Sequence, residues 1–245
     1  MANFDSAGIS IHYEVYGDGP AIVLVHGLFS DIQGNWAQIG WVDALTPLRQ
    51  VIAMDCRGHG GSDKPHDVTA YSDEVMSDDV IRLMDHLGVE RADVFGYSMG
   101  SEIAVPLLFK YPHRLTSVIL GGFGDNAGYW EAVTPDIFLA ESADDVEHPY
   151  ARGVRLYAEA SGADLRATAA YQAGYTPPLD GRRLEADVPV LVVNGGDDDT
   201  VGSLDGLFEA VPGAQLEIVP DRDHLTVIGD PRFKQLVVDF LSSDS

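Results

Sequence analysis

Cysteine, lysine and long apolar runs are all scarce in this sequence of 245 residues. Cys56 is its one cysteine, which excludes an internal disulfide and is typical of a protein in a reducing compartment. Apolar runs such as Ala21–Val25 and Val190–Val193 are far too short to cross a bilayer. Residues 1–6 lack the basic start and the apolar stretch of a secretory signal. We therefore expect a cytoplasmic protein that does not insert into a membrane.

Positive charge is equally scarce, because 15 Lys and Arg residues stand against 39 Asp and Glu residues, a formal net charge of -24 at pH 7. Such a charge repels phosphate groups, which argues against nucleic acid as a partner and against docking on an anionic membrane. The acidic residues are spread along the chain, which is typical of a well-solvated surface, with adaptation to high salt as the alternative. The partner class that remains is a small molecule. Whether the protein is a monomer or a homodimer is left open.

Short apolar runs alternate with helical patterns, and this alternation predicts a largely parallel sheet with helices on both faces. Ile9–Tyr16 alternates apolar and polar residues and ends at a Gly/Pro turn, which indicates an outer hairpin. A helical pattern covers Ser72–Leu87, and another begins at Asp230. Continuous apolar runs, which indicate strands buried on both faces, occur at Ala21–Val25, Val51–Met54, Ala92–Gly96, Ser117–Leu120, Val190–Val193 and Leu216–Val219.

One segment, from about Asp125 to Glu185, interrupts this alternation. It is rich in Ala and Tyr and favours helices near Tyr150–Ala160 and Leu165–Tyr175. Such a long interval between buried strands indicates an insertion. We expect a single domain over residues 1–245, with a core made of residues 1–124 and 186–245 and a small helical cap, residues 125–185, inserted before the strand at 189–193.

A candidate nucleophile lies in the pentapeptide Gly96-Tyr97-Ser98-Met99-Gly100, which has the pattern G-x-S-x-G. The pentapeptide follows a buried strand and precedes a helical pattern, and this strand–turn–helix setting is the one in which the motif holds a reactive serine. Glycines are needed at both ends because a side chain there would collide with neighbouring backbone. The pattern therefore predicts that the Ser98 hydroxyl is lifted off the end of the sheet.

A serine hydroxyl is a poor nucleophile near neutral pH, so it needs a base and an acid that orients the base. His224 directly follows the last predicted strand and is the candidate base, while Asp197, Asp198 and Asp199 follow the strand before it. The order Ser, Asp, His along the chain is one of the known orders of a catalytic triad. Because the carboxyl ends of parallel strands meet at one edge of a sheet, we expect these groups to converge.

With these residues in view, the chain resembles the α/β-hydrolase family over nearly its whole length. His26-Gly27 is similar to the family's oxyanion loop, and Asp55–Ser62 is similar to its D-x-R-G-x-G-x-S loop. The resemblance implies the α/β-hydrolase fold, a mostly parallel eight-stranded sheet flanked by helices. The spacing from Gly195 to Val201 is similar to the family's acid loop and selects Asp198.

The family also implies roles for backbone groups and leaves the acid partly open. The backbone N–H groups of Leu28 and Met99 would form the oxyanion hole. Asp197 and Asp199 remain open as errors of register. Asp125 remains open because some members of the family carry the acid after the preceding strand.

Other kinds of site have little support in the sequence. The remaining histidines have no partners at metal-ligand spacing, and there is no phosphate loop or dinucleotide fingerprint, so we expect no metal and no cofactor. His26 and His59 are expected to brace loops. Family members that act on haloalkanes or epoxides need a carboxylate where this chain has Ser98.

We therefore expect a serine hydrolase that cleaves a small carboxylic ester through an acyl-enzyme. Phe29, Trp130 and Phe138 are the candidate residues for binding the substrate. Four alternatives remain on the same scaffold: a lactonase, a carbon–carbon bond hydrolase, a perhydrolase, and a small-molecule receptor with slow turnover.

Overall fold

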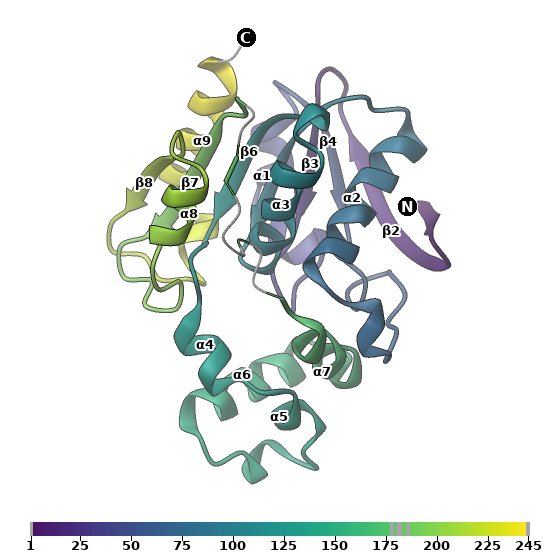
Figure 1. The fold of residues 1–245 in the computed structure, drawn as a ribbon, viewed down its shortest axis with the longest axis vertical. Helices are drawn as coiled ribbons and strands as arrows, with labels where there is room; N and C mark the ends of the chain where they lie inside the picture. Colours follow the sequence, from purple (N-terminus) through teal and green to yellow (C-terminus); the bar gives the residue numbers. More distant parts are fainter. Residues whose placement is uncertain (1, 177–178, 180–182, 185–186, 244–245) are drawn as a thin grey trace.

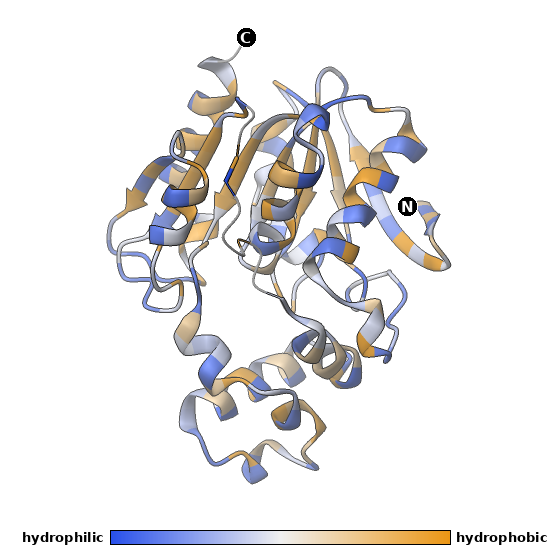
Figure 2. Ribbon diagram, in the orientation of Figure 1, coloured by the Kyte–Doolittle hydropathy of each residue, from blue (hydrophilic) through white to orange (hydrophobic). Residues whose placement is uncertain are grey.

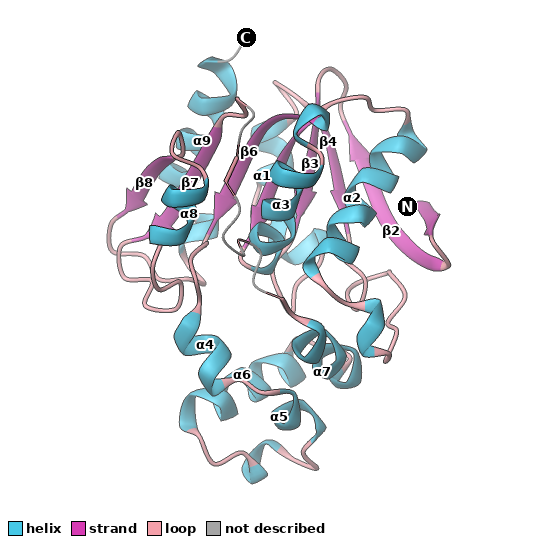
Figure 3. Ribbon diagram, viewed as in Figure 1, coloured by secondary structure: helices cyan, strands magenta, loops and turns pink. Residues whose placement is uncertain are grey.

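The computed structural model describes residues 2–176, 179, 183–184 and 187–243. Within these residues eight strands form one sheet in the order β1-β2-β4-β3-β5-β6-β7-β8 (Figure 3). The strands are β1 (Ala2–Ser6), β2 (Ile9–Tyr16), β3 (Ala21–Val25), β4 (Gln50–Met54), β5 (Ala92–Tyr97), β6 (Leu115–Gly121), β7 (Val190–Gly195) and β8 (Gln215–Val219).

The sheet is parallel from β4 to β8, and the β1–β2 hairpin joins it antiparallel through β4. The fold is therefore the largely parallel sheet that the sequence predicts, with the eight strands that the family resemblance implies. The strand added to the seven apolar or alternating runs is β1, a short edge strand with the sequence Ala-Asn-Phe-Asp-Ser. Its polar residues hide it from a search for apolar runs.

Helices cover both faces of the sheet (Figure 1). Apolar residues of α2, α3 and α8 pack on one face, and those of α1 and α9 pack on the other. Figure 2 shows the apolar strands between helices whose outer sides are polar. The helices around the sheet are α1 (Trp41–Leu45), α2 (Asp73–Leu87), α3 (Met99–Lys110), α8 (Asp205–Ala210) and α9 (Pro231–Ser243).

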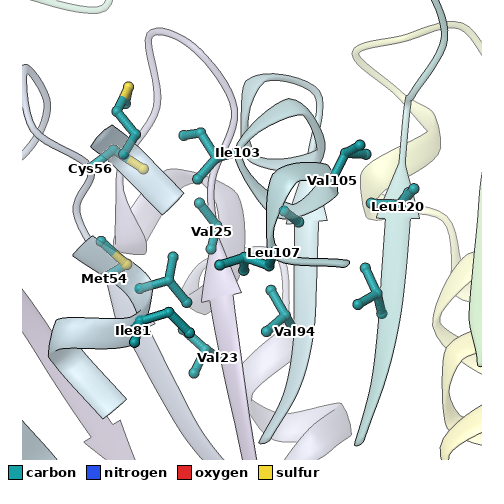
Figure 4. Packing of buried hydrophobic residues seen from close by; sticks show 14 of the residues in the cluster. Val23, Val25, Met54, Cys56, Ile81, Val94, Ile103, Val105, Leu107 and Leu120 are labelled. Carbon is teal, nitrogen blue, oxygen red and sulfur yellow. The ribbon is translucent and has the colours of Figure 1, made fainter. Parts of the chain in front are cut away.

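The apolar core packs against α3, the helix that directly follows Ser98. Val25 of β3 and Val94 of β5 lie in one buried cluster with Ile103 and Leu107 of α3, and Figure 4 shows these side chains together. Each is at most 1% exposed. Burying a side chain of this size contributes about 1.5–3 kcal/mol. The start of α3 is thus fixed firmly against the ends of β3 and β5.

The prediction for the last strand was wrong in one respect. The run Leu216–Val219 was expected to be buried on both faces, but Leu216 is 40% exposed and Ile218 is 43% exposed. The reason is position, because β8 is at the edge of the sheet and pairs with β7 alone. A local apolar run does not reveal where its strand stands in the sheet.

In the described part of the segment between β6 and β7 there are four α-helices: α4 (Ala127–Ala132), α5 (Pro135–Leu139), α6 (Pro149–Ala160) and α7 (Leu165–Gly174). They lie beyond one end of the sheet, where the chain leaves β6 (Figure 1). α6 and α7 confirm the two predicted helices, while α4 and α5 are too short to show a helical period. The predicted boundary at 185–186 lies outside the described residues. That the chain folds as one domain stays a prediction.

The cap has a small apolar cluster of its own, which includes Ile137, Phe138 and Ala158. α7 contacts α5 within the cap and also reaches the core, because Ala170 and Tyr171 belong to the cluster beneath it. No helix in the described part of the chain is both long and apolar enough to cross a membrane.

Candidate active site

The turn from β5 into α3 holds Ser98 in a strained backbone conformation. Its φ is +53°, a value that residues other than glycine rarely adopt. The backbone N–H of Ser98 donates to the Gly121 carbonyl oxygen at 2.8 Å, which ties the turn to β6. Such strain persists only where surrounding structure enforces it, and it is common at functional sites.

Glycine is required at both ends of this turn because backbone passes too close for a side chain. A Cβ on Gly96 would lie 2.2 Å from the Gly100 carbonyl oxygen, and a Cβ on Gly100 would lie 1.9 Å from that of Val25. The structure thus bears out the steric reason for the G-x-S-x-G spacing.

His224 lies in the loop after β8, and its imidazole reaches the serine. Its Nε2 is 2.8 Å from Ser98 Oγ, and its Nδ1 is 2.7 Å from Asp198 Oδ2. The Tyr97 hydroxyl donates to the His224 carbonyl oxygen, and the two rings are 5.6 Å apart between centroids. These contacts fix the loop to β5 beside Ser98.

Of the four candidate acids, the structure brings Asp198 to His224. Asp198 Oδ1 accepts from the Thr200 backbone N–H at 3.1 Å and from its hydroxyl at 2.6 Å. Burial disfavours the charged carboxylate. The hydrogen bond and charge of His224 and the two hydrogen bonds from Thr200 outweigh this effect, so the Asp198 pKa is held below its usual range. Asp198 is thus ionised near neutral pH and can orient and stabilise a protonated imidazole.

The other three acidic candidates lie elsewhere. Asp197 and Asp199 are exposed, and the carboxylate hydrogen-bonded to His224 Nδ1 belongs to Asp198 instead. Asp125 Oδ1 accepts from the backbone N–H groups of Ala127 and Ser203, both at 3.2 Å. Asp125 therefore supports the loop between β6 and α4.

The loop after β3 lies against the serine. A Cβ on Gly27 would stand 3.4 Å from Ser98 Cβ, and the Gly27 carbonyl oxygen accepts from the Ser30 backbone N–H at 3.3 Å, which closes a tight turn. Leu28 and Met99 both line the cavity at Ser98. Their backbone N–H groups make no hydrogen bond to any residue that the structure describes. Two unpaired donors beside a nucleophile can bind a negatively charged oxygen.

The two histidines expected to brace loops do so. His26 Nδ1 is 2.8 Å from the Gly27 carbonyl oxygen, and its Nε2 accepts from the Cys56 backbone N–H at 3.0 Å. Burial lowers the pKa of His26 to about 4 and that of His59 to about 3. Both rings are therefore neutral near pH 7. Burial also raises the pKa of the thiol of Cys56, the residue whose backbone N–H donates to His26.

A cavity of about 690 Å³ opens over Ser98 between the core and the cap. This volume is typical of a small-molecule site. Ser98, His224, Phe29 and Trp130 all line it. The cavity thus places the Ser98 hydroxyl and two of the three predicted substrate-binding residues around one space.

The third predicted residue, Phe138, was assigned wrongly. Phe138 is 2% exposed, belongs to the apolar cluster of the cap and does not line the cavity. Its ring packs behind Phe29, with centroids 6.0 Å apart. An aromatic residue in a short helix gives no sequence signal that separates a packing face from a binding face.

Sequence reasoning missed a buried carboxyl in the cavity wall. Glu102 lines the cavity one helical turn after Ser98 and is 3% exposed. The available signal was one acidic residue inside the otherwise apolar stretch Met99–Leu108. Among the described residues no group of three or more His, Cys, Asp or Glu side chains could hold a metal ion.

Comparison with known proteins identifies the family of this chain. The family model described as "alpha/beta hydrolase fold" matches residues 20–187. The chain is 30% identical to 2-(acetamidomethylene)succinate hydrolase of Mesorhizobium japonicum over 219 residues, which cover 88% of this chain and 70% of that protein.

Two solved structures are similar over almost the whole length. The enol-lactonase from Burkholderia xenovorans LB400 has a TM-score of 0.79 at 27% identity, covering 98% of this chain and 100% of that one. Est816, described as an N-acyl homoserine lactone degrading enzyme, has a TM-score of 0.72 at 26% identity, covering 98% and 100%. The strained serine turn, the histidine that reaches it and the matched family model lead to one conclusion: the chain belongs to the alpha/beta hydrolase family.

Proposed function

We propose that this hydrolase cleaves small carboxylic esters with Ser98 as nucleophile, His224 as general base and acid, and Asp198 as the group that orients the imidazole. The observation that carries the proposal is the continuous hydrogen-bonded chain from Ser98 Oγ through His224 to Asp198, at 2.8 and 2.7 Å, in the wall of a cavity. This arrangement can remove the serine proton as the hydroxyl attacks a carbonyl carbon.

The reaction would proceed in two halves. Ser98 Oγ bonds to the ester carbonyl carbon while His224 Nε2 takes its proton, and the negative charge moves to the former carbonyl oxygen. The backbone N–H groups of Leu28 and Met99 would hold that oxygen, and one such donor contributes about 2.7–4 kcal/mol to lowering the barrier. The alcohol leaves with the proton from His224. Water, deprotonated by the same imidazole, then releases the carboxylic acid and restores Ser98.

A lactone is the second candidate substrate because it is a cyclic ester and needs the same chemistry. Two structures of 25% identity or more belong to proteins described as lactone-cleaving. Carbamate, carbon–carbon and peracid chemistry would use the same residues, and a receptor with slow turnover is distinguished by the rate of turnover.

The test is turnover of p-nitrophenyl esters from acetate to dodecanoate, with an N-acyl homoserine lactone alongside. Wild type is compared with Ser98→Ala and with Ser161→Ala, a control serine that is exposed after α6. Turnover of about 1–1000 per second that Ser98→Ala lowers by at least about 10⁴-fold, and Ser161→Ala leaves unchanged, supports the proposal. Turnover that survives in Ser98→Ala contradicts it, and turnover far below one per second favours a receptor.

A further inference from the structure

A buried acid stands in the cavity wall next to the proposed nucleophile. The Glu102 backbone N–H donates to the Ser98 carbonyl oxygen at 3.2 Å, so Glu102 lies one turn of α3 beyond the serine. Ser98 and Glu102 line the same cavity. A molecule attached to Ser98 can therefore reach the Glu102 carboxyl with a short substituent.

The partners of this carboxyl are neutral donors from the cap. Asn126 Nδ2 donates to Oε1 at 2.7 Å, and the Tyr171 hydroxyl donates to Oε2 at 3.2 Å. The Tyr175 hydroxyl is a longer partner at 3.5 Å from Oε1. Asn126 is held in the left-handed region, at φ +49°, while it makes its bond. The contacts orient the acid, but they bring no positive charge.

Trp130 completes the surroundings of the acid. Its ring stacks on Tyr175 with centroids 3.5 Å apart. Its indole N–H is buried and satisfies no hydrogen-bond geometry with a described residue, although it lies near enough to Glu102 to favour the charged form. The indole N–H is thus a buried donor near the acid that no described residue satisfies.

Burial and the lack of a cation set the energetics. Burial raises the pKa of Glu102 to about 7, and the hydrogen bonds from Asn126, Tyr171 and Tyr175, together with the nearby Trp130 indole, only partly offset this. A buried carboxylate is costly unless it is paired. None of the described residues that line the cavity is a lysine or an arginine. A positive charge on the ligand would pair with the Glu102 carboxylate, which no cation of the described lining does.

We infer that Glu102 is a substrate-recognition residue that favours esters bearing a protonated amine on a short substituent and disfavours esters bearing a carboxylate. This inference rests on the proposed function because it takes Ser98 as the attachment point. The described lining also holds no lysine or arginine to bind a carboxylate such as the succinate in the name of the Mesorhizobium relative. Selection by charge is thus expected to differ from that of a dicarboxylate hydrolase.

Arylboronic acids test this because boron bonds to the serine oxygen and each substituent can be matched in size. The dissociation constants of phenylboronic acid and of its meta and para aminomethyl and carboxy derivatives are measured by calorimetry in about 0.5 M salt, which screens the acidic surface. The proteins are wild type, Glu102→Gln and Asp199→Asn. Asp199→Asn removes one exposed charge near the site without altering the cavity wall.

Wild type and Asp199→Asn should bind one aminomethyl isomer at least about tenfold more tightly than phenylboronic acid, and the carboxy isomers at least about tenfold more weakly, as a charge-assisted contact requires. In Glu102→Gln these ratios should fall to within about threefold of unity. Equal ratios in wild type and Glu102→Gln, with or without a lower melting temperature, would mean that Glu102 only ties the cap to α3.

Two further outcomes are separable. Equal binding of phenylboronic acid to wild type and to Ser98→Ala contradicts the proposed function. The affinities of the aminomethyl and carboxy derivatives relative to phenylboronic acid then still test the role of Glu102. If Glu102→Gln does not fold, the ratios of wild type decide: no preference for the amine overturns the inference, and a tenfold preference that persists in high salt supports it.

Discussion

Asp198 Oδ2 lies 2.7 Å from His224 Nδ1, and its other oxygen is held by Thr200. The carboxylate therefore has one orientation, in which it accepts a hydrogen bond from the imidazole Nδ1–H and leaves Nε2 free to accept one from the Ser98 hydroxyl. This relationship separates Asp198 from the acidic residues on either side of it, which the sequence alone left open.

Asp198→Asn should lower kcat by about 10³–10⁴-fold because the amide does not stabilise a protonated imidazole and favours the wrong tautomer. KM should change little. The matched control is Asp199→Asn, which removes the same charge from an exposed neighbour. Ester turnover by the two variants checks this, and equal losses in both would rule out a specific role for Asp198.

Gly100→Ala should destabilise the protein by about 3 kcal/mol or more. The new Cβ would stand 1.9 Å from the Val25 carbonyl oxygen, and neither α3 nor β3 can move away without disturbing the core between them. Gly128→Ala in α4 is the control, because nothing lies within 4 Å of its Cβ position. Urea unfolding should show a control that is unchanged or up to about 1 kcal/mol more stable. A well-folded Gly100→Ala of wild-type stability would contradict the close approach.

Stability should fall as the pH drops from about 6.5 towards 4 because His26 must stay neutral in the folded protein. Burial lowers its folded pKa to about 4, whereas an unfolded histidine titrates near 6.5, so the unfolded chain binds more protons in this range. The free energy of unfolding therefore has its full His26 contribution above about pH 6.5, and it falls by about 2 kcal/mol by pH 5. His59, whose pKa burial lowers to about 3, acts in the same direction.

The measurement is the free energy of unfolding in urea at about pH 7.5 and pH 5, for wild type and His26→Gln. The loss between the two pH values should be smaller in the variant by about 2 kcal/mol, whatever its starting stability. The loss of net negative charge near the pI of about 4.3 would favour the folded state, so it cannot mimic this result. The same pH dependence in both proteins would show that His26 does not control it.

The buried pair of Arg57 and Asp79 should matter far more than an exposed pair. Arg57 Nε and Nη2 each lie 2.7 Å from a different Asp79 oxygen, and Nη1 donates to the Ala70 carbonyl oxygen. Asp79→Asn should cost about 3–5 kcal/mol because it leaves a buried guanidinium without its countercharge. Arg222→Met breaks the exposed contact with Asp230 and should cost less than about 1 kcal/mol. Equal losses in urea unfolding would refute the distinction.

Much of the fold could be predicted because its signals are local. The parallel strands are continuous apolar runs, and the glycines of the serine turn are required by contacts with adjacent backbone. His224 and Ser98 could be identified because each follows a strand whose carboxyl end lies at the same edge of the sheet. The family resemblance then supplied the register that selects Asp198.

The errors come from properties that are not local. β8 looks buried in sequence, but its exposure depends on its place at the sheet edge. Phe138 and Trp130 are both aromatic residues of short cap helices, yet only Trp130 lines the cavity. Glu102 was passed over because nothing in an apolar helix indicates which wall of a cavity its one acid will face.

The most direct test of the central claim is the reaction of the protein with a fluorophosphonate, followed by intact mass and by mass analysis of the peptide that contains Ser98. The triad geometry predicts one adduct per chain, located on Ser98 and formed far more slowly in His224→Ala. Ser98→Ala should take up none. An adduct on a different residue, or labelling that persists in Ser98→Ala, would contradict Ser98 as the nucleophile.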